Sequence, residues 1–558
     1  MSKVSSIVDQ YGQPMVKSPP NKPMALNGGW GRVPYDAADN TGAHTGNWFP
    51  YLTSPDVELN PWRDLIVSRV RDLVRNDGWA AGIITRILDN AIGSVFRPLT
   101  KPDYRTLAVK TGFAFDAQWA SEWSSIVDSH WRSWANDDGR YCDTGRRLTF
   151  TQMMYAGMCH SLIDGDAIAM VNYIPERLNQ QALYATSVQL IDPDRLSNPN
   201  QGIDEMYCRG GVKIDRYGAP VGYYFREAHI SDYFALGKTA QWEYVDKETE
   251  WGRPNIVHYF ESDRASEHRG GAGILTPIVQ RLKMITKYDQ TELDAAIMSS
   301  IFGLSLESPH DHAAAVDAMD DMEVNKELMA YQTNRSEYHR GKNLSIGNVR
   351  ISTFYPGEEL KTIASPHPHN QYAPFLGAAL RHIAAGTGVT AQQVSNDWSD
   401  VNYSSARAAA LEGWKTLTRR RDSFARGFAS PVRSAWLEEC CMVNDLPWPK
   451  GVNDEWLMNN IAVLKTPISN CQWLGPGRGW IDPVAEKQGS VLGMEAGLST
   501  LQSETAENAG GDWEEMLDQR AIEIKRCKEL GIPLPAWTGP QQDGQTTSAA
   551  QPPQKPTP

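Results

Sequence analysis

The stretch from Phe354 to Arg426 reads FYPGEELKTIASPHPHNQYAPFLGAALRHIAAGTGVTAQQVSNDWSDVNYSSARAAALEGWKTLTRRRDSFAR. Apolar residues recur at helical spacing over about 375–383 and predict a helix. A polar loop rich in Gly, Asn, Asp and Ser follows, from about 386 to 402, and a second helix starts at Tyr403-Ser404-Ser405. The stretch contains no catalytic signature. A polar loop between two helices therefore favours a mechanical or structural protein over an enzyme.

The size and charge of the chain limit its function further. With 558 residues and 62.2 kDa it is too long for one compact core, so several subdomains are expected. Its formal net charge is −13. Proteins that bind DNA tightly are usually basic, because contacts to phosphates supply most of their affinity. Any contact of this chain with DNA is therefore expected to be weak.

The cysteines indicate the redox environment of the chain, and the apolar segments indicate whether it is secreted or spans a membrane. Seven cysteines without CxxC spacing predict reduced thiols, with neither a disulfide framework nor a structural zinc site. The N-terminus lacks the apolar segment of a secretory signal. No run of about 18 uncharged apolar residues exists, so no membrane span is expected. The 19 tryptophans favour core packing over carbohydrate stacking.

The first part of the chain is predicted to be an arm followed by helices. Residues 1–58 are rich in Gly, Pro, Asn and Asp and are interpreted as an extended arm, whose aromatic residues could dock onto a neighbouring subunit. A helix is then expected from a cap at Asn60, with Pro61 in its first position. It would end at Asn76-Asp77-Gly78, and further helices would follow up to Gly93, over 116–135 and over 150–164.

Short strands and a long helix come next. The strands are predicted at Asp166–Tyr173, Val188–Ile191, Lys213–Ile214, Val221–Phe225 and Asn255–Phe260, with a hairpin turn at 217–220. They make this an α+β region. A long amphipathic helix from Ile274 to about Phe302 would span about 45 Å. A helix of that length must run past a small core or lie beside copies of itself.

The remaining segments have simpler interpretations. Gly271-Ala272-Gly273, at the start of the long helix, is interpreted as a hinge. Two further helices are expected near 483–496 and 512–529. The Pro/Gln/Thr-rich tail after 530 is expected to be disordered.

Two carboxylate pairs are candidates for enzyme chemistry. Asp164 with Asp166, or Asp192 with Asp194, could bind a metal or act as acid and base. Neither pair has a histidine at metal-ligand spacing, and Asp favours turns beside strands. A hydrolase that uses one of these pairs is the alternative from another functional class. It predicts a monomer or dimer and loss of activity on Asp→Asn exchange.

Three further motifs favour structural interpretations. Gly237-Lys238-Thr239 lacks the first glycine of a P-loop and is interpreted as an exposed loop. His367-Pro368-His369 is a weak metal motif in an extended linker. Cys440-Cys441 lies in an apolar helical context and is interpreted as packing. HExxH and GxSxG motifs are absent from the sequence.

Basic residues gather on two predicted helices. The groups are Arg419, Arg420 and Arg421, and Arg281, Lys283 and Lys287. Each group could contact the DNA backbone, form a solvated helix face or pair with an acidic neighbouring subunit. The sequence leaves these alternatives open.

The order of several motifs resembles that of phage portal proteins of the lambda type. The matching segments are SRVRDLVRNDGWAAGIITRILDNAIG (68–93), LIDPDRL (190–196), KIDRYGAPVGYYFRE (213–227), RGGAGILTPIVQRLKMITKYDQTELDAA (269–296), PGEEL (356–360), LRHIAAGTGV (380–389), DWSDVNYSSARAAALEGW (397–414) and a segment over 473–500 that begins WLGPGRGWIDPVAEKQ. Each motif is weak alone. Their shared order over about residues 30–520 is specific.

The resemblance implies an α+β portal fold assembled as a cyclic ring, a dodecamer, at one capsid vertex, without catalysis or a cofactor. Viral double-stranded DNA would be packaged through its channel and later ejected. The expected partners are other copies of the chain, the terminase large subunit, the major capsid protein, head–tail connector or neck proteins and the DNA in transit, with no membrane. The protein would reside in the virion, and in the host cytoplasm during assembly. Another head or neck protein of the virion is the nearest alternative.

The resemblance also implies a division of the chain into regions. They are a wing (59–270), a stem helix (271–302), a clip (303–369), a second stem helix (370–386), a tunnel loop (387–403), a long wing helix and return (404–470), a crown (471–530) and a tail (531–558) without family pattern.

The tunnel loop is the candidate functional site. Its expected channel residues are Gln392, Gln393, Asn396, Asp397, Trp398, Asn402 and Tyr403. A channel through which DNA slides cannot hold phosphates strongly, because each neutralised phosphate adds salt-dependent affinity. A polar, nearly uncharged loop in an acidic chain fits such transit.

Overall fold

The computed structural model describes residues 47–271, 273–300, 304–307, 372–399, 402–444, 446–478 and 483–532, with short segments between 330 and 362. The chain divides into two units, residues 1–54 and 55–558. In the described end of the first unit, Trp48, Phe49 and Tyr51 are exposed. All helices and strands named below belong to the second unit.

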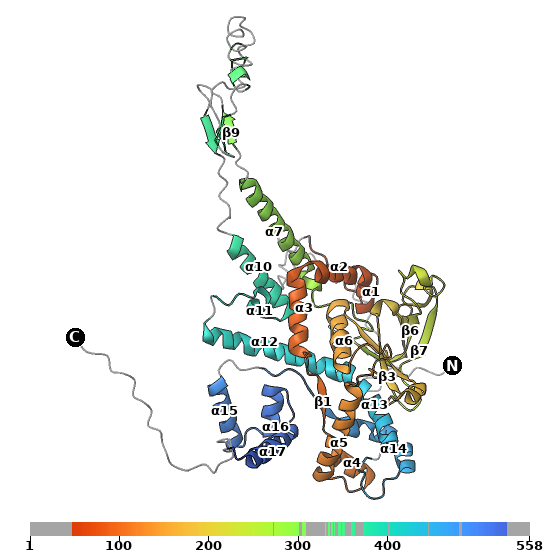
Figure 1. Ribbon diagram of the computed structural model, residues 1–558. Coiled ribbons are helices and arrows are strands. Elements are labelled where there is room, and N and C mark those ends of the chain that lie inside the picture. Colours follow the sequence, from red (N-terminus) through yellow and green to blue (C-terminus); the bar gives the residue numbers. More distant parts are fainter. Residues whose placement is uncertain are drawn as a thin grey trace, which may run out of the picture. The chain divides into compact units, whose positions relative to one another are not determined.

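Helices and strands are mixed along the second unit (Figure 1). The helices are α1 (Pro55–Leu59), α2 (Arg63–Asn76), α3 (Gly78–Ala91), α4 (Tyr104–Thr111), α5 (Ala117–Ala135), α6 (Phe150–Asp164), α7 (Val279–Ser300), α10 (Tyr372–Thr387), α11 (Ala391–Ser395), α12 (Tyr403–Phe424), α13 (Ser430–Val443), α14 (Asp454–Ser469), α15 (Pro483–Glu495), α16 (Leu501–Glu504) and α17 (Trp513–Leu530). The strands are β1 (Arg97–Thr100), β2 (Ala167–Tyr173), β3 (Thr186–Ile191), β4 (Cys208–Arg209), β5 (Val212–Ile214), β6 (Pro220–Arg226), β7 (Trp242–Asp246), β8 (Ile256–Tyr259), β9 (Leu304–Glu307), β10 (Leu344–Ile346), β11 (Val349–Ile351), β12 (Glu359–Thr362) and β13 (Cys471–Leu474). The α+β class is confirmed.

The start of the helical region differs from the prediction. Residues 55–59 form α1, so the arm ends before residue 58. Asn60 does not cap the next helix, which begins after Trp62 without a side-chain cap. Instead, Asn60 Nδ2 donates a hydrogen bond to Asp204 at 2.6 Å. A residue far along the sequence therefore engages the side chain that local preference assigned to capping.

The other early helices agree with the prediction. Asp77 lies between α2 and α3, and its side chain accepts a hydrogen bond from the Ala80 amide at 2.9 Å. A side-chain cap of this kind satisfies one of the amides that a helix start leaves unpaired. The predicted helices 116–135 and 150–164 are α5 and α6, and those near 483–496 and 512–529 are α15 and α17.

Two antiparallel sheets contain the predicted strands. One has the order β3-β2-β8 and the other the order β4-β5-β6-β7. The predicted hairpin joins β5 to β6, and Asp215 Oδ1 accepts from the amides of Tyr217 and Ala219, both at 2.8 Å. A separate pair joins β1 to β13, with Arg97 opposite Leu474. The chain after residue 470 therefore returns to the helices near the start of the unit.

The core is rich in aromatic side chains. Trp123, Trp131 and Trp134 on α5 and Trp436 on α13 are at most 2% exposed. Trp131 meets Trp436 edge to face with ring centroids 5.0 Å apart, a favourable aromatic geometry. Core packing is thus confirmed for these tryptophans.

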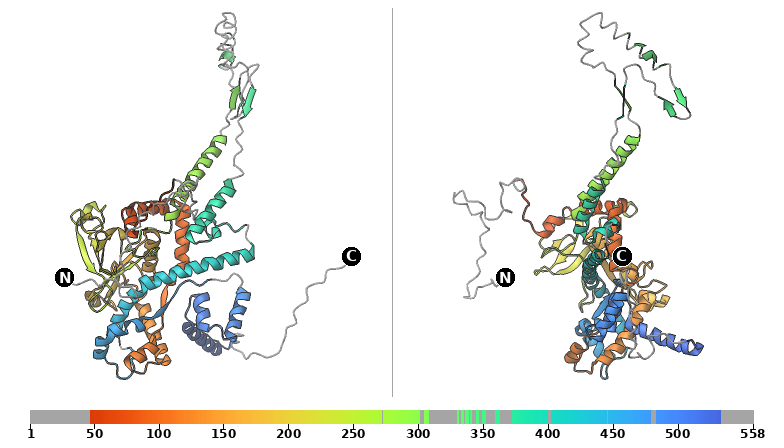
Figure 2. Two further views of the ribbon diagram at one scale, coloured as in Figure 1. Left: turned by 180° about the vertical axis from the view of Figure 1, so that it is seen from behind. Right: turned by 90° about the vertical axis from the view of Figure 1, so that its left-hand side faces the viewer.

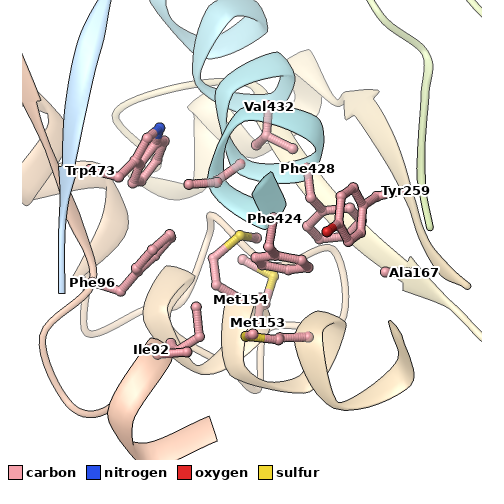
Figure 3. Close-up of a cluster of buried hydrophobic side chains, with 14 of the residues drawn as sticks. Ile92, Phe96, Met153, Met154, Ala167, Tyr259, Phe424, Phe428, Val432 and Trp473 are labelled. Atoms are coloured by element: carbon pink, nitrogen blue, oxygen red, sulfur yellow. The ribbon is translucent and has the colours of Figure 1, made fainter. Parts of the chain in front are cut away.

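A π-helical turn links α12 to α13 within this core. The turn spans Ala425–Ala429. Phe424 and Phe428 stack with centroids 5.0 Å apart and lie beside Met153 and Met154 of α6 (Figure 3). The turn thereby keeps both rings in the core while the helix continues.

The long helix is shorter than predicted. A 3-10 turn, Thr276–Ile278, precedes α7, which has 22 residues and spans about 33 Å. α10 lies beside α7 (Figures 1 and 2). The rings of Tyr288 and Tyr372 stack at 5.7 Å, and the Tyr372 hydroxyl donates to Asp289 at 2.8 Å. β9, after α7, pairs antiparallel with β12, before α10.

The glycines before α7 pack closely against other backbone segments, and the hinge at Gly271-Ala272-Gly273 stays a prediction. A Cβ on Gly273 would lie 2.4 Å from the carbonyl oxygen of Ile163, and one on Gly270 would lie 2.2 Å from that of Gly165. Both contacts are with backbone, which cannot move aside cheaply. The absence of side chains here lets two backbone segments touch.

Two of the remaining sequence motifs have the surroundings that were predicted for them. Residues 237–239 lie in an exposed turn, and Cys440 and Cys441 are buried, as predicted. His367-Pro368-His369 and the tail beyond residue 532 lie outside the described residues. Across the described parts of the chain, no helix combines the length and apolar character needed to cross a membrane.

Candidate functional site

The polar loop contains a short capped helix. α10 ends at Thr387, and α11 occupies five residues of the predicted loop. Thr390 and Gln393 form a capping box: the Gln393 amide donates to Thr390 Oγ1 at 3.2 Å, and the Thr390 amide donates to Gln393 Oε1 at 3.1 Å. Asn396 ends the helix in the left-handed conformation, with φ of 60°. Gln393 therefore shapes the loop.

The exposed tip of the loop is the segment Asn396–Ser399. Trp398 is 49% exposed. Asp397 accepts hydrogen bonds from the Ser399 hydroxyl at 2.6 Å and the Ser399 amide at 3.0 Å. These bonds favour the carboxylate and hold the pKa of Asp397 below its ordinary value. The tip thus presents one negative charge and one aromatic ring to solvent.

The far end of the loop is fixed by the start of α12. Asn402 Oδ1 accepts a hydrogen bond from the Ser405 amide at 2.8 Å, and Tyr403 is the first helical residue. Gln392 is half-buried. The seven predicted residues therefore share one loop, but Gln393 and Asn402 cap helices, while Asn396, Asp397 and Trp398 face solvent.

The three consecutive arginines of α12 point to three different parts of the chain. Arg419 lies 3.7 Å from Glu261, and its side chain is 63% exposed. Arg420 Nη1 donates to the carbonyl oxygen of Thr387 at 2.8 Å. Arg421 Nη1 donates to the carbonyl oxygen of Pro476 at 3.2 Å.

Burial decides what these arginines can still contact. Arg420 is only 9% exposed, and burial lowers the pKa of Arg420 and of Arg421. Arg420 is thus not available to DNA or a neighbouring subunit, and Arg421 is half-buried. The exposed member of the predicted cluster is Arg419.

The basic residues of α7 are more accessible. Lys283 Nζ lies 3.2 Å from Asp72, and its side chain is 60% exposed. Lys287 is exposed and Arg281 is half-buried. A surface ion pair such as that of Lys283 contributes little to stability and can be exchanged for another partner. The basic residues of α7 could therefore still contact the DNA backbone, form a solvated helix face or pair with an acidic neighbouring subunit.

The first carboxylate pair belongs to a buried ionic network. Asp166 is fully buried, 2.8 Å from His258 Nε2 and 3.1 Å from Arg269 Nε. Burial raises the pKa of Asp166, but His258, Arg269 and Arg63 together lower it to about 2. Asp164 accepts from Arg71 Nε at 2.7 Å. Both carboxylates are already neutralised by cationic side chains.

The second pair shares Arg71 with the first. Arg71 lies 3.2 Å from Asp192 and 2.6 Å from Asp194. His229, which sequence spacing did not indicate, lies 3.3 Å from Asp194 and completes a group that could hold a metal ion. The guanidinium of Arg71 supplies the positive charge between these carboxylates. The structure thus favours turns and ion pairs over acid–base chemistry.

Arg63 is one of the buried arginines that sequence interpretation missed. It is 2% exposed, although it lies in the first turn of α2. Its spacing could have revealed it, because Arg63, Val67 and Val70 form one helical stripe. Arg63 Nε donates to the carbonyl oxygen of Gly270 at 3.2 Å. It thereby ties α2 to the segment before α7.

Comparison with known proteins identifies the family. The family described as phage portal protein, lambda family, matches residues 41–421, which include the polar loop and the three arginines. The portal protein of Escherichia phage N15 is 31% identical over 500 residues, covering 89% of this chain and 90% of that protein. Portal protein B of Escherichia phage lambda is 30% identical over 499 residues, with the same coverage of each chain.

A solved structure is also similar. It is a chain in the virion of a native gene transfer agent particle, with 12% identity and a TM-score of 0.41, and the match covers 79% of this chain and 92% of that chain. From the family match and the two phage relatives, the chain belongs to the lambda family of phage portal proteins.

Proposed function

We propose that this chain forms a closed ring, a dodecamer, through which double-stranded viral DNA enters and leaves a capsid. The portal role rests on family membership. The observation that supports DNA transit is the exposed tip Asn396–Ser399, which lies between two capped helices and bears a carboxylate but no cation.

The chemistry of the tip suits a moving duplex. A cationic side chain at this place would bind phosphates and release counterions, which slows transit at low salt. Asp397 instead repels phosphates, and the low pKa of its carboxyl keeps it charged at neutral pH. A ring of such loops would centre the duplex without holding it.

The regions are assigned by the same proposal. Residues 271–302 and 370–386, with α7 and α10, form the stem. Residues 303–369 form the clip, residues 387–403 the tunnel loop and residues 471–530 the crown, while residues 59–270 form the wing together with 404–470. On α7, Leu293 and Ile297 lie one turn apart on one face, and each is more than half exposed. Adjacent copies in a closed ring would cover this apolar face.

The partners follow from this assignment. The clip would dock the terminase large subunit during packaging and neck proteins afterwards, and the wing would face the major capsid protein. Assembly would take place in the host cytoplasm, and the finished ring would remain in the virion.

The experiment compares Trp398→Arg with Trp398→Gln in a packaging reaction. Both variants remove the indole side chain of Trp398, and only Trp398→Arg adds a cation at the tip. We expect both to assemble as the wild type does. Trp398→Arg should slow DNA filling at low salt and recover as salt rises, because each added phosphate contact contributes a slope of about −0.9 to the logarithmic salt dependence.

Two outcomes would contradict the proposal. Equal filling by both variants at all salt concentrations would show that this loop does not face DNA. Failure of the wild-type chain to form a ring with a central hole, seen by light scattering and negative-stain images, would contradict the portal assignment itself.

A further inference from the structure

A large cleft opens in the second unit beside the buried ionic network. Its volume is about 880 Å³, and α2, the segment 194–204 and the end of β6 line it. Five arginines and three aspartates contribute to its wall. This excess of positive charge is unusual in a chain with a net charge of −13.

One of the five arginines is buried without a carboxylate. Arg63, Arg71 and Arg269 have acidic partners, and Arg75 is exposed. Arg226 is 4% exposed and lies over the ring of Trp242 at 4.9 Å. Among the residues that the structure describes, no carboxylate lies within 4.0 Å of its guanidinium, and its Nε has no hydrogen-bond partner.

A second unsatisfied polar atom belongs to a residue of the same wall. Asn60 Oδ1 is buried without a hydrogen-bond partner in the described structure. A buried polar atom without a partner costs about 1–3 kcal/mol, and more when it is charged. Unmet hydrogen-bonding capacity at two residues in one cleft points to a missing ligand.

The cleft wall and the neighbouring surface indicate the kind of ligand. Ile203 and Ile230 in the wall are 89% and 60% exposed, and nearby Met206 is 72% exposed. A single inorganic anion would leave these apolar groups uncovered and fill little of the volume. An acidic peptide segment with apolar side chains would meet both the arginine and the isoleucines.

We propose that this cleft binds an acidic segment of a second copy of this chain, whose carboxylate pairs with Arg226. The chain carries 67 acidic against 54 basic residues, so a neighbouring copy presents mostly negative charge. The inference rests on the ring of the proposed function, which places identical copies side by side. In the ring the buried cation gains the anion that a single copy does not supply.

The first test uses the wild-type chain. Hydroxyl-radical footprinting with mass spectrometry compares the oxidation of Ile203 and Met206 in separated monomers and in purified rings. Protection of both residues in the ring, by fivefold or more, is the expected result. Equal oxidation in both states overturns the inference while leaving the ring intact, and so does protection that appears only after another virion protein is added.

The second test uses variants. Arg226→Met removes the charge and keeps an unbranched side chain, and Arg226→Lys restores a cation. Arg216→Met is the matched control, because Arg216 is exposed and stacks on the exposed ring of Tyr217. Native mass spectrometry over a dilution series reports the concentration at which rings dissociate.

We expect Arg226→Met to dissociate at a concentration at least tenfold higher than the wild type. Arg226→Lys should recover part of the loss, and Arg216→Met should match the wild type. Unfolding curves show whether the Met variant is folded as a monomer. A folded Arg226→Met chain that forms rings at the wild-type concentration overturns the inference, whereas a wild-type chain that forms no ring overturns the proposed function on which it rests.

Discussion

Arg420 on α12 donates a hydrogen bond from Nη1 to the carbonyl oxygen of Thr387, 2.8 Å away at the end of α10. Thr387 is fully buried. The bond therefore attaches the start of the exposed loop to the helix behind it, and it uses an arginine that the sequence offered as a surface contact. Arg420 thereby couples the position of the loop to α12.

The Arg420→Met variant should lose stability. It leaves the Thr387 carbonyl buried without its charged donor, which costs about 1.5–3 kcal/mol for a hydrogen bond to a charged group. Denaturant unfolding of the variant measures the change. Arg419→Met is the control, because its exposed pair with Glu261 should contribute less than about 1 kcal/mol. Equal losses in the two variants would contradict the structural role of Arg420.

The Asp166→Asn variant should destabilise the buried ionic network around Asp166. It removes the carboxylate that Arg269 and His258 share and leaves buried charge unpaired. Breaking such a pair costs about 3–5 kcal/mol. Asp64→Asn, at a side chain that is 97% exposed, should change stability by less than about 0.5 kcal/mol. Chemical denaturation of both variants tests the difference, and a small loss for Asp166→Asn would refute it.

Stability should fall in acid because of the same carboxylate. The pKa of Asp166 is about 2 in the folded chain, below its ordinary value of 3.8. The unfolded chain therefore binds the proton more readily, and the stabilisation is present above pH 4 and is lost as pH falls from about 4 to about 2. The pKa values of Asp56, Asp164 and Asp194 are lowered as well. The melting temperature, followed across this window, should drop steadily, and a flat profile would argue against the network.

The Gly273→Ala variant should destabilise the segment before α7. Its Cβ would lie 2.4 Å from the carbonyl oxygen of Ile163, so backbone must shift. Gly82→Ala is the matched control inside α3, where a Cβ meets nothing within 4 Å. Since alanine is the better helix former, the control should gain up to about 1 kcal/mol. Thermal unfolding distinguishes the two, and an unchanged Gly273→Ala chain would contradict the close packing of this segment.

Much of the fold could be predicted because residues that become buried recur in the sequence at the spacing of a helix or a strand. The tryptophans of α5 recur on one helical face, and the five strands show β-type residues between turn signals. The loop between α10 and α12 was also predictable from its polar composition. Its internal helix was not recognised, although Thr390 and Gln393 carry the capping-box pattern.

The polar side chains were predicted less well than the elements that carry them. Asn60 could cap a helix locally, but Asp204 engages it. Asp192 and Asp194 fit turns, and Arg71 from a distant helix pairs with both. Local preference differs by about 1 kcal/mol between alternatives, so a single tertiary hydrogen bond can reverse it.

The sequence by itself determined many of the longer helices, five of the strands, the α+β class and the order of motifs that marks a lambda-type portal protein, because each depends on neighbours within a few residues or on shared motif order. Only the tertiary structure decided that Arg420 faces Thr387, that Asp166 lies among arginines and that Gly273 touches Ile163. These outcomes depend on which distant segments meet, and a charged side chain is buried only where such a meeting supplies its partner.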